Sequence, residues 1–286
     1  MLVLAGCLGQ RYSGDLMNEL PEIDAIVGTG AWDRLPEAIQ TALQGMRTIF
    51  TEGNSILPDA SMPRMRSTPP YLAYVKIAEG CNHSCAFCAI PQIRGPLVSR
   101  TIESIRQEVS CLVAEGVREI NLVAQDTTSY GIDLYGRPRL ADLLKELCSV
   151  EGRFWLRILY SYPKNFSAEL IQLMANEPKI CKYVDIPLQH VHDDLLRAMR
   201  RPDRRKDIEK LIASLRSAMP DVAIRTTFIV GLPGETEAHY QELRDFVETK
   251  RLDHVGVFVY SPEEGTAAAG FTDRIPEEVK ADRYEE

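Results

Sequence analysis

From Tyr71 onward, β-rich runs alternate with segments of helical periodicity, and this alternation constrains the fold more than any other feature. There are six such runs, and each of the first five is followed by a helix-period segment. The pattern is typical of a parallel sheet joined by right-handed helical crossovers. Because a closed barrel of this kind needs eight units, we predict an α/β fold over 71–286, an incomplete six-unit β/α barrel. In such folds chemistry collects on the loops that follow the strands. The six runs are YLAYVKIA, REINLVAQ, FWLRILYSY, KYVDIPL, VAIRTTFIVG and DHVGVFVYS.

Residues 1–50 predict part of a smaller α/β domain. A buried parallel strand needs partner strands and a preceding crossover, so we expect the natural N-terminus to lie upstream of Met1. Residues 51–70 are rich in Pro, Ser and Thr without periodicity and are expected to form a linker. The elements predicted before the linker are a strand at Met1–Ala5, a helix at Gly14–Leu20, a strand at Asp24–Val27 and a helix at Trp32–Leu43.

The composition is that of a folded protein, with 45% hydrophobic and 26% charged residues. A formal net charge of -8 gives no overall field that would attract phosphate backbones. The basic stretch Arg197–Arg205 is a local exception, which a solvated helix end would also explain. We therefore expect no nucleic-acid partner and favour a basic protein partner. No apolar run approaches the roughly 20 residues of a membrane span, so no membrane partner is expected either.

The seven cysteines follow no regular disulfide framework. In a chain of this length they are expected to be reduced thiols or metal ligands. The residues before Cys7 include no basic side chain, so the opening MLVLAGC does not make an export signal. We therefore expect a cytoplasmic location. Cys111, Cys148 and Cys181 are expected to be buried small hydrophobic residues.

Three cysteines, Cys81, Cys85 and Cys88, follow the first predicted barrel strand in the segment GCNHSCAFC. Thiolates this close together can converge on one centre, and cysteine thiolates hold iron–sulfur clusters. With no fourth cysteine nearby, one iron would stay open to a small molecule. Two alternatives remain. One is a zinc site of three cysteines and His83. The other is a cluster that only carries electrons, although such clusters normally have four cysteine ligands.

This cysteine spacing after the first strand of a six-unit barrel, with Phe87 before the last cysteine, resembles the radical S-adenosylmethionine (SAM) superfamily. The resemblance implies a 4Fe-4S cluster on Cys81, Cys85 and Cys88, whose open iron binds the methionyl amino and carboxylate groups of SAM. It further implies reductive cleavage of SAM to a deoxyadenosyl radical, and hence an electron donor such as flavodoxin or ferredoxin. The barrel would orient the reactants and shield them.

Further motifs are similar to those of the methylthiotransferase branch of this superfamily. In that branch an N-terminal domain carries three cysteines for an auxiliary 4Fe-4S cluster. Cys7 matches the last of them, and the other two are expected upstream; alone, Cys7 would also suit a buried thiol. The branch normally adds a β-rich substrate-binding domain after the barrel, which we expect to be absent here, so both ends are expected to be truncated. The motifs are AGCLGQRY, VAQDTTSYG, DIPLQH, TTFIVGLPGET and YSPEEGT.

The resemblance also implies which residues contact SAM and substrate. Polar residues at strand ends are often plain turn formers, and glycines suit a tight turn as well as a close approach to the adenosine moiety. The pocket candidates have alternatives too, a core or turn histidine and two solvated glutamates. The candidates for SAM binding are Phe87, Gln125, Asp126, Gln189, Gly231 and Gly234, and those for the substrate pocket are His190, Glu263 and Glu264.

Asp126, together with the segments DLYG, MRRPDRR and EEGT, is similar to the branch member that modifies small-subunit ribosomal protein twelve. That similarity implies abstraction of hydrogen from the β-carbon of an aspartate, followed by attack on a sulfur delivered by the auxiliary cluster. A second SAM molecule would supply the methyl group. The first alternative is a methylthiotransferase acting on adenosine in transfer RNA. An alternative of a different class is a non-catalytic iron–sulfur or zinc-binding protein.

Overall fold

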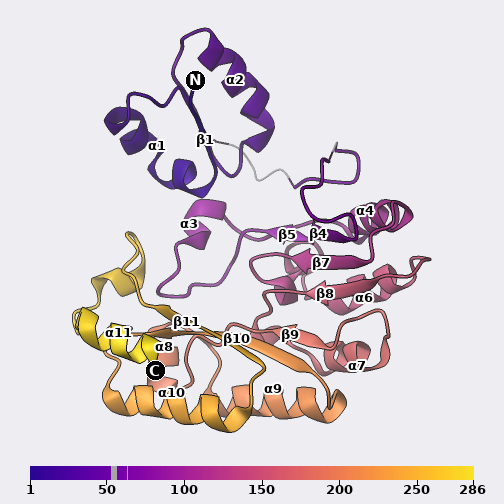
Figure 1. The fold of residues 1–286 in the computed structure, drawn as a ribbon, viewed down its shortest axis with the longest axis vertical. Coiled ribbons are helices and arrows are strands. Elements are labelled where there is room, and N and C mark those ends of the chain that lie inside the picture. The colour runs from indigo at the N-terminus through magenta and orange to yellow at the C-terminus, as the bar shows by residue number, and fades with distance from the viewer. Residues whose placement is uncertain (53–56, 63) are drawn as a thin grey trace. The chain divides into compact units, whose positions relative to one another are not determined.

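The computed structural model describes residues 1–286 except 53–56 and 63, and it divides into two compact units (Figure 1). The division between Pro58 and Asp59 falls within the expected linker, of which 53–56 and 63 lie outside the described residues. Two segments of the expected barrel domain cluster with the first unit instead. The first unit comprises Met1–Pro58, Glu79–His83 and Ala89–Val98, and the second comprises Asp59–Ala78, Ser84–Cys88 and Ser99–Glu286.

The first unit contains a three-stranded parallel sheet in the order β1-β2-β3. Its apolar core includes Ala25 and Val27 on β2, Ala38 on α2 and Phe50 on β3. Strand β3 was not predicted, and α1 starts at Cys7, well before the expected Gly14. The elements are β1 (Val3–Ala5), α1 (Cys7–Glu19), β2 (Ala25–Val27), the 3-10 turn η1 (Trp32–Arg34), α2 (Leu35–Leu43), β3 (Thr48–Phe50) and α3 (Ile90–Arg94).

The second unit contains the six predicted barrel strands, in two parallel three-stranded ladders, β4-β7-β8 and β9-β10-β11. A parallel bridge between Leu156 and Ile180 joins the ladders, and the Ser161 N–H donates to the Asp185 carbonyl at 2.8 Å. The strands therefore follow one another in chain order, as an incomplete barrel requires. They are β4 (Leu72–Lys76), β7 (Glu119–Val123), β8 (Trp155–Ile158), β9 (Tyr183–Asp185), β10 (Ala223–Val230) and β11 (His254–Val259); β5 (Ala78–Glu79) and β6 (Val98–Ser99) are short.

The five predicted crossover helices are also present, and Figure 1 shows α9 and α10 lying together on one side of β9, β10 and β11. In α4 the buried residues Ile102, Ile105, Val109 and Leu112 recur at helical spacing, which gives the helix one face to bury. The crossover helices are α4 (Ile102–Ala114), α6 (Leu140–Cys148), α7 (Ala168–Asn176), α9 (Arg205–Ala218) and α10 (Glu237–Lys250). The remaining elements are η2 (Thr127–Ser129), α5 (Ile132–Tyr135), η3 (Pro163–Asn165), α8 (Asp193–Ala198), η4 (Ala267–Gly270) and α11 (Glu277–Glu285).

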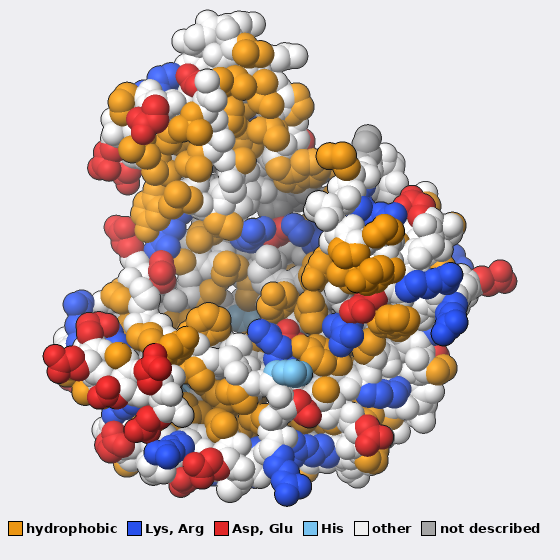
Figure 2. Space-filling model, viewed as in Figure 1, with side chains coloured by type: hydrophobic (Ala, Val, Ile, Leu, Met, Phe, Trp, Pro, Cys, Tyr) orange, Lys and Arg blue, Asp and Glu red, His pale blue; other side chains and the backbone are white. Residues whose placement is uncertain are grey.

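The surface carries charges of both signs. On the face drawn in Figure 2, Lys and Arg side chains are interspersed with Asp and Glu over the second unit. Leu8, Leu43 and Met46 of the first unit are exposed apolar side chains. Among the described residues, no helix is both long enough and apolar enough to cross a membrane.

Candidate active site

The cysteine loop follows β4 and β5, the position at which the barrel pattern predicts chemistry. The division between the units passes through the loop, with Cys81 in the first unit and Cys85 and Cys88 in the second. All seven cysteines lie in the described part of the chain, and none of them forms a disulfide there. The three loop thiols are half-buried. This donor set fits an iron–sulfur cluster.

Backbone contacts within the first unit fix the loop at Cys81. Gly80 has φ +77°, and a Cβ there would lie 2.1 Å from the Pro96 carbonyl oxygen, so only glycine fits. The Cys81 N–H donates to the Gly95 carbonyl at 3.1 Å. The His83 N–H lies 3.4 Å from the Cys81 sulfur. The sulfur is therefore held on a turn whose shape the chain enforces.

The second half of the loop is anchored within the second unit. The Ala86 N–H donates to the Met199 carbonyl at 2.9 Å, and the Ala86 carbonyl accepts the Ala268 N–H at 2.8 Å. Phe87 packs against an apolar cluster that includes Met199 and Tyr260. Packing thus accounts for an aromatic residue between Cys85 and Cys88, and a contact of Phe87 with SAM stays a prediction.

Asp126, after β7, is turned inward. Its carboxylate accepts the Thr128 N–H at 2.9 Å and hydrogen bonds from the hydroxyls of Thr128 and Ser129. The residue is 3% exposed and caps η2. These contacts favour the turn-forming alternative for Asp126, and a contact of SAM with Asp126 or with the half-buried Gln125 stays a prediction.

Gln189 and His190 follow β9, and Gln189 is half-buried whereas His190 is buried. Gln189 has φ +71° and exchanges backbone hydrogen bonds of 2.8 Å with Thr227 and Ile229 on β10. His190 is fully buried, and its Nδ1 accepts the His192 N–H at 3.0 Å. Burial, followed by the neighbouring positive groups, lowers the pKa of His190 to about 3. Its burial and lowered pKa favour the alternative of a neutral core histidine, and a place in the substrate pocket stays a prediction.

The two predicted glycines after β10, Gly231 and Gly234, differ in what surrounds the position of a Cβ. Gly231 has φ +77°, and a Cβ there would lie 2.5 Å from the Lys280 side chain on α11. The same glycine donates its N–H to Glu235 at 2.9 Å. Gly234 has φ +87° with open space where a Cβ would stand. Close packing by Lys280 explains Gly231, whereas the space at Gly234 is compatible with the predicted approach of a ligand.

The last predicted loop follows β11. Glu263 is half-buried and Glu264 is exposed. The Glu263 carbonyl accepts the N–H and the hydroxyl of Thr266, at 3.1 and 2.7 Å. The backbone of this loop is thus a closed turn, and a role of the two carboxylates in substrate binding stays a prediction.

Cys7 is the first residue of α1, and Nη2 of Arg94 donates to its sulfur at 3.2 Å. Among the other cysteines, Cys111 is exposed on α4, so the prediction that it is buried was wrong. Cys148 and Cys181 are half-buried, and burial raises the pKa of both thiols, that of Cys148 to about 12. No local sequence pattern predicts the contact of Cys7 with Arg94, because 87 positions separate the two residues.

A group of three possible metal ligands, His192, Asp194 and His239, lies outside the predicted site. The Nδ1 atoms of the two histidines accept the backbone N–H groups of Asp194 and Thr236, each at 3.2 Å. A histidine that binds metal through Nε2 carries its proton on Nδ1, where it would oppose these N–H groups. We therefore assign both imidazoles to helix capping.

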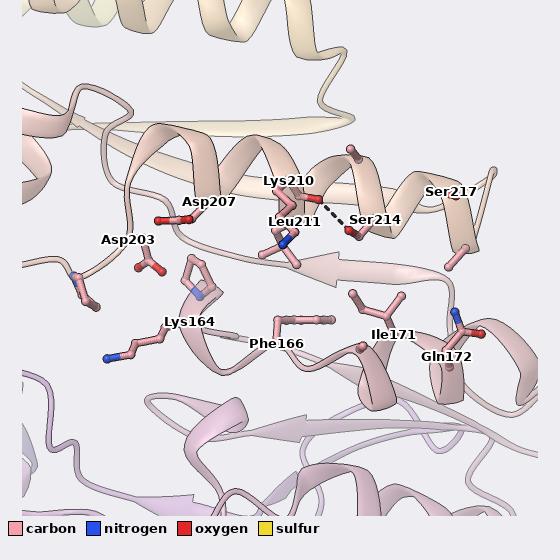
Figure 3. A pocket seen from close by; sticks show the side chains of 15 residues that line it. Lys164, Phe166, Ile171, Gln172, Asp203, Asp207, Lys210, Leu211, Ser214 and Ser217 are labelled. Carbon is pink, nitrogen blue, oxygen red and sulfur yellow. Dashed lines mark hydrogen bonds between the residues drawn. The ribbon is translucent and has the colours of Figure 1, made fainter.

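A cavity of about 1010 Å³ lies between α7 and α9, as Figure 3 shows. Phe166 and Ile171 form one side, and Leu211 and Ser214 on α9 form the other. The residues lining the cavity include none of the predicted cofactor or substrate residues. It is therefore a groove of the outer helical layer rather than the site of the cysteine loop.

Solved structures of other proteins share this fold. TsrM from Kitasatospora setae, described as a radical S-adenosylmethionine methyltransferase with cobalamin and a [4Fe-4S] cluster bound, matches with a TM-score of 0.70 at 17% identity. The match covers 90% of this chain and 56% of that one. Coproporphyrinogen III oxidase (HemN) from Escherichia coli matches with a TM-score of 0.57 at 20% identity, covering 77% and 52%. At these identities the likeness concerns the fold, and it confirms the predicted partial barrel.

Curated relatives are much more similar in sequence. Ribosomal protein uS12 methylthiotransferase RimO from Desulforamulus reducens is 52% identical over 284 residues, which are 99% of this chain and 64% of the relative. The protein of that name from Geobacter sulfurreducens is 47% identical over 285 residues, with the same coverage. The chain thus spans less than two thirds of these relatives. Their names confirm the predicted resemblance to the ribosomal-protein branch. The family described as the Radical SAM superfamily matches residues 75–247, and this chain belongs to it.

Proposed function

We propose that this chain acts as part of a radical SAM methylthiotransferase that modifies an aspartate of ribosomal protein uS12. The observation that carries the proposal is the 52% identity, over 99% of the chain, to a relative of that name. The half-buried cysteine loop after the first barrel strand supplies the ligands that such chemistry needs. A uS12 substrate is also compatible with the net charge of -8, since a basic protein would be attracted and a polyanion repelled.

The proposed cofactors are a 4Fe-4S cluster on Cys81, Cys85 and Cys88, and SAM. When bound, they supply one-electron cleavage of the sulfonium and so the means of hydrogen abstraction. The chain's own part is positioning. The turn at Gly80 holds Cys81, and the apolar side chains packed against Phe87 anchor the rest of the loop. Asp126 stabilises the turn beside Gln125.

For sulfur insertion we propose that Cys7 is a ligand of an auxiliary cluster. It is the one candidate ligand for that cluster among the described residues, so the remaining ligands would come from elsewhere in a complete enzyme. We further propose a cytoplasmic location and an electron donor of the flavodoxin or ferredoxin class. The alternatives are a transfer-RNA adenosine methylthiotransferase and, from a different class, an iron–sulfur or zinc protein without turnover.

Cleavage of SAM tests the radical chemistry in this chain directly. Anaerobic reconstitution with iron and sulfide, followed by reductant and SAM, is expected to yield 5′-deoxyadenosine. Cys85→Ala should lose the cluster and the product, because two thiolates do not hold it. Cys111→Ala makes the same change at an exposed cysteine outside the loop and should retain both. A cluster and deoxyadenosine in Cys85→Ala would contradict the assignment of Cys85 as a cluster ligand. Zinc instead of iron in the wild-type loop would favour the alternative of a zinc protein without turnover.

A further inference from the structure

Arg94 joins two side chains that are far apart in the sequence. Its Nη1 donates to the Glu79 carboxylate at 2.7 Å, and its Nη2 donates to the Cys7 sulfur at 3.2 Å. All three residues belong to the first unit. Glu79 is buried and Arg94 is half-buried, so the carboxylate end of this ion pair is shielded from solvent. Because the two bonds use different nitrogens, the guanidinium makes both at once.

The two ends of the cysteine loop meet at this ion pair. Glu79 lies two residues before Cys81, and Arg94, the last residue of α3, lies six residues after Cys88. Next to the pair, the Cys81 N–H donates to the Gly95 carbonyl at 3.1 Å, and the Leu97 N–H donates to the Asn82 side chain at 3.0 Å. The ion pair and these hydrogen bonds therefore hold the segment before the loop against the segment after it.

α3 is also fastened to the rest of the first unit. The Thr29 hydroxyl donates to the Ile93 carbonyl at 2.9 Å, beside Arg94. Arg94 itself stands at the C-terminus of α3, where a positive charge is favourable.

We propose that Arg94 is a positioning residue for the cysteine loop, coupling the conformation at Cys81 to the sulfur of Cys7 through Glu79. The inference rests on the proposed function only in taking Cys81 as a cluster ligand. It assigns to Arg94 and Glu79 a role that the sequence motifs left unassigned. Residues that orient metal ligands typically change metal affinity about 10- to 100-fold when they are replaced.

The test compares Arg94→Gln, Arg94→Lys and Cys7→Ala, with Arg34→Gln as the matched control. Arg34 belongs to the same unit, stands at the N-cap of α2 and forms an exposed ion pair with Glu37 at 2.9 Å. In the metal-free chain, hydrogen exchange is measured at the amides of Cys81 and Leu97. In the reconstituted chain, the rate of iron loss to a chelator and the electron paramagnetic resonance spectrum of the reduced cluster are measured.

Arg94→Gln is expected to accelerate exchange at Cys81 and Leu97, with the amide of Gly28 as an unchanged reference that bonds to Phe50 at 2.7 Å. It should also speed iron loss about 10-fold or more and alter the spectrum. Arg94→Lys should show effects between those of the wild type and Arg94→Gln, because one ammonium does not reproduce the two hydrogen bonds that the guanidinium makes at once. Cys7→Ala should produce the same changes in weaker form.

Wild-type exchange at both amides in Arg94→Gln would overturn the inference, whether or not a cluster assembles. So would equal effects of Arg94→Gln and Arg34→Gln on exchange and iron loss. Failure of the wild-type chain to hold any cluster would instead contradict the proposed function, and the exchange measurement would still decide the role of Arg94.

Discussion

The Asp126 carboxylate accepts the backbone N–H of Thr128 at 2.9 Å, inside the turn that follows β7. The same carboxylate accepts a hydrogen bond from the Ser129 hydroxyl, and the residues of the turn are buried. Asp126→Ala would leave these donors without an acceptor, so we expect the free energy of unfolding to fall by about 2 kcal/mol. Denaturant titration of the metal-free chain measures this.

Asp126→Asn is the matched variant, since it keeps one oxygen acceptor and the side-chain size. We expect it to lose less stability than Asp126→Ala. If both variants bound SAM normally and were as stable as wild type, the structural role of Asp126 would be refuted. A large loss of SAM binding at unchanged stability would restore the direct contact that the sequence predicted.

His190 should make the stability depend on pH. Its folded-state pKa is lowered to about 3 by burial and by positive neighbours, whereas the unfolded chain takes up the proton near the ordinary value of 6.5. Because the unfolded state binds more protons in this window, the contribution of His190 to stability falls as the pH drops from 6.5 toward 3. The expected slope is about 1.4 kcal/mol per pH unit.

The measurement for His190 is the free energy of unfolding of wild type and His190→Asn as a function of pH. An asparagine oxygen can replace Nδ1 as the acceptor of the His192 N–H, but it does not titrate. The difference between the two proteins should therefore change with pH below about 6.5 and be constant above about 7.5. Parallel curves throughout would mean that the pKa of His190 is the same in the folded and unfolded states, which would contradict its burial as a neutral imidazole.

The thiols outside the cysteine loop should react at different rates. Cys111 is exposed on α4, whereas burial raises the pKa of Cys148 to about 12 and leaves little thiolate at neutral pH. In the metal-free chain at about pH 8, iodoacetamide should label Cys111 well before Cys148. Peptide mass spectrometry over time shows this, with the denatured chain as a control in which the rates converge. Equal rates in the folded chain would contradict the burial of Cys148.

The sequence predicted the barrel well because its signal is strong locally. Each of the six strands is an apolar, β-rich run, and helices such as α4 show a regular apolar face. The misses are elements with weak local signals. β3 has only three residues, Thr48–Phe50, and α1 is interrupted by non-helical angles at Tyr12 and exposes Leu8. Neither gives a clear period.

The site was predictable only where spacing along the chain carries the information. The cysteine loop is such a case, since its three thiols lie within eight residues. The inward turn of Asp126 and the burial of His190 depend on what packs around them, which a strand-end position does not reveal. The contact between Arg94 and Cys7 joins two segments of the folded unit, so no local pattern predicts it.

The proposed modification of uS12 can be tested by locating a methylthio group by mass spectrometry. A protein of the relatives' full length that contains this chain is incubated, reduced and with SAM, with purified ribosomal protein uS12 and separately with unmodified transfer RNA. We expect a methylthio group on an aspartate of uS12 and none on the transfer RNA, and substitution of Cys85 should abolish the modification. A modified adenosine with an untouched aspartate would contradict the proposed substrate while leaving the radical chemistry intact.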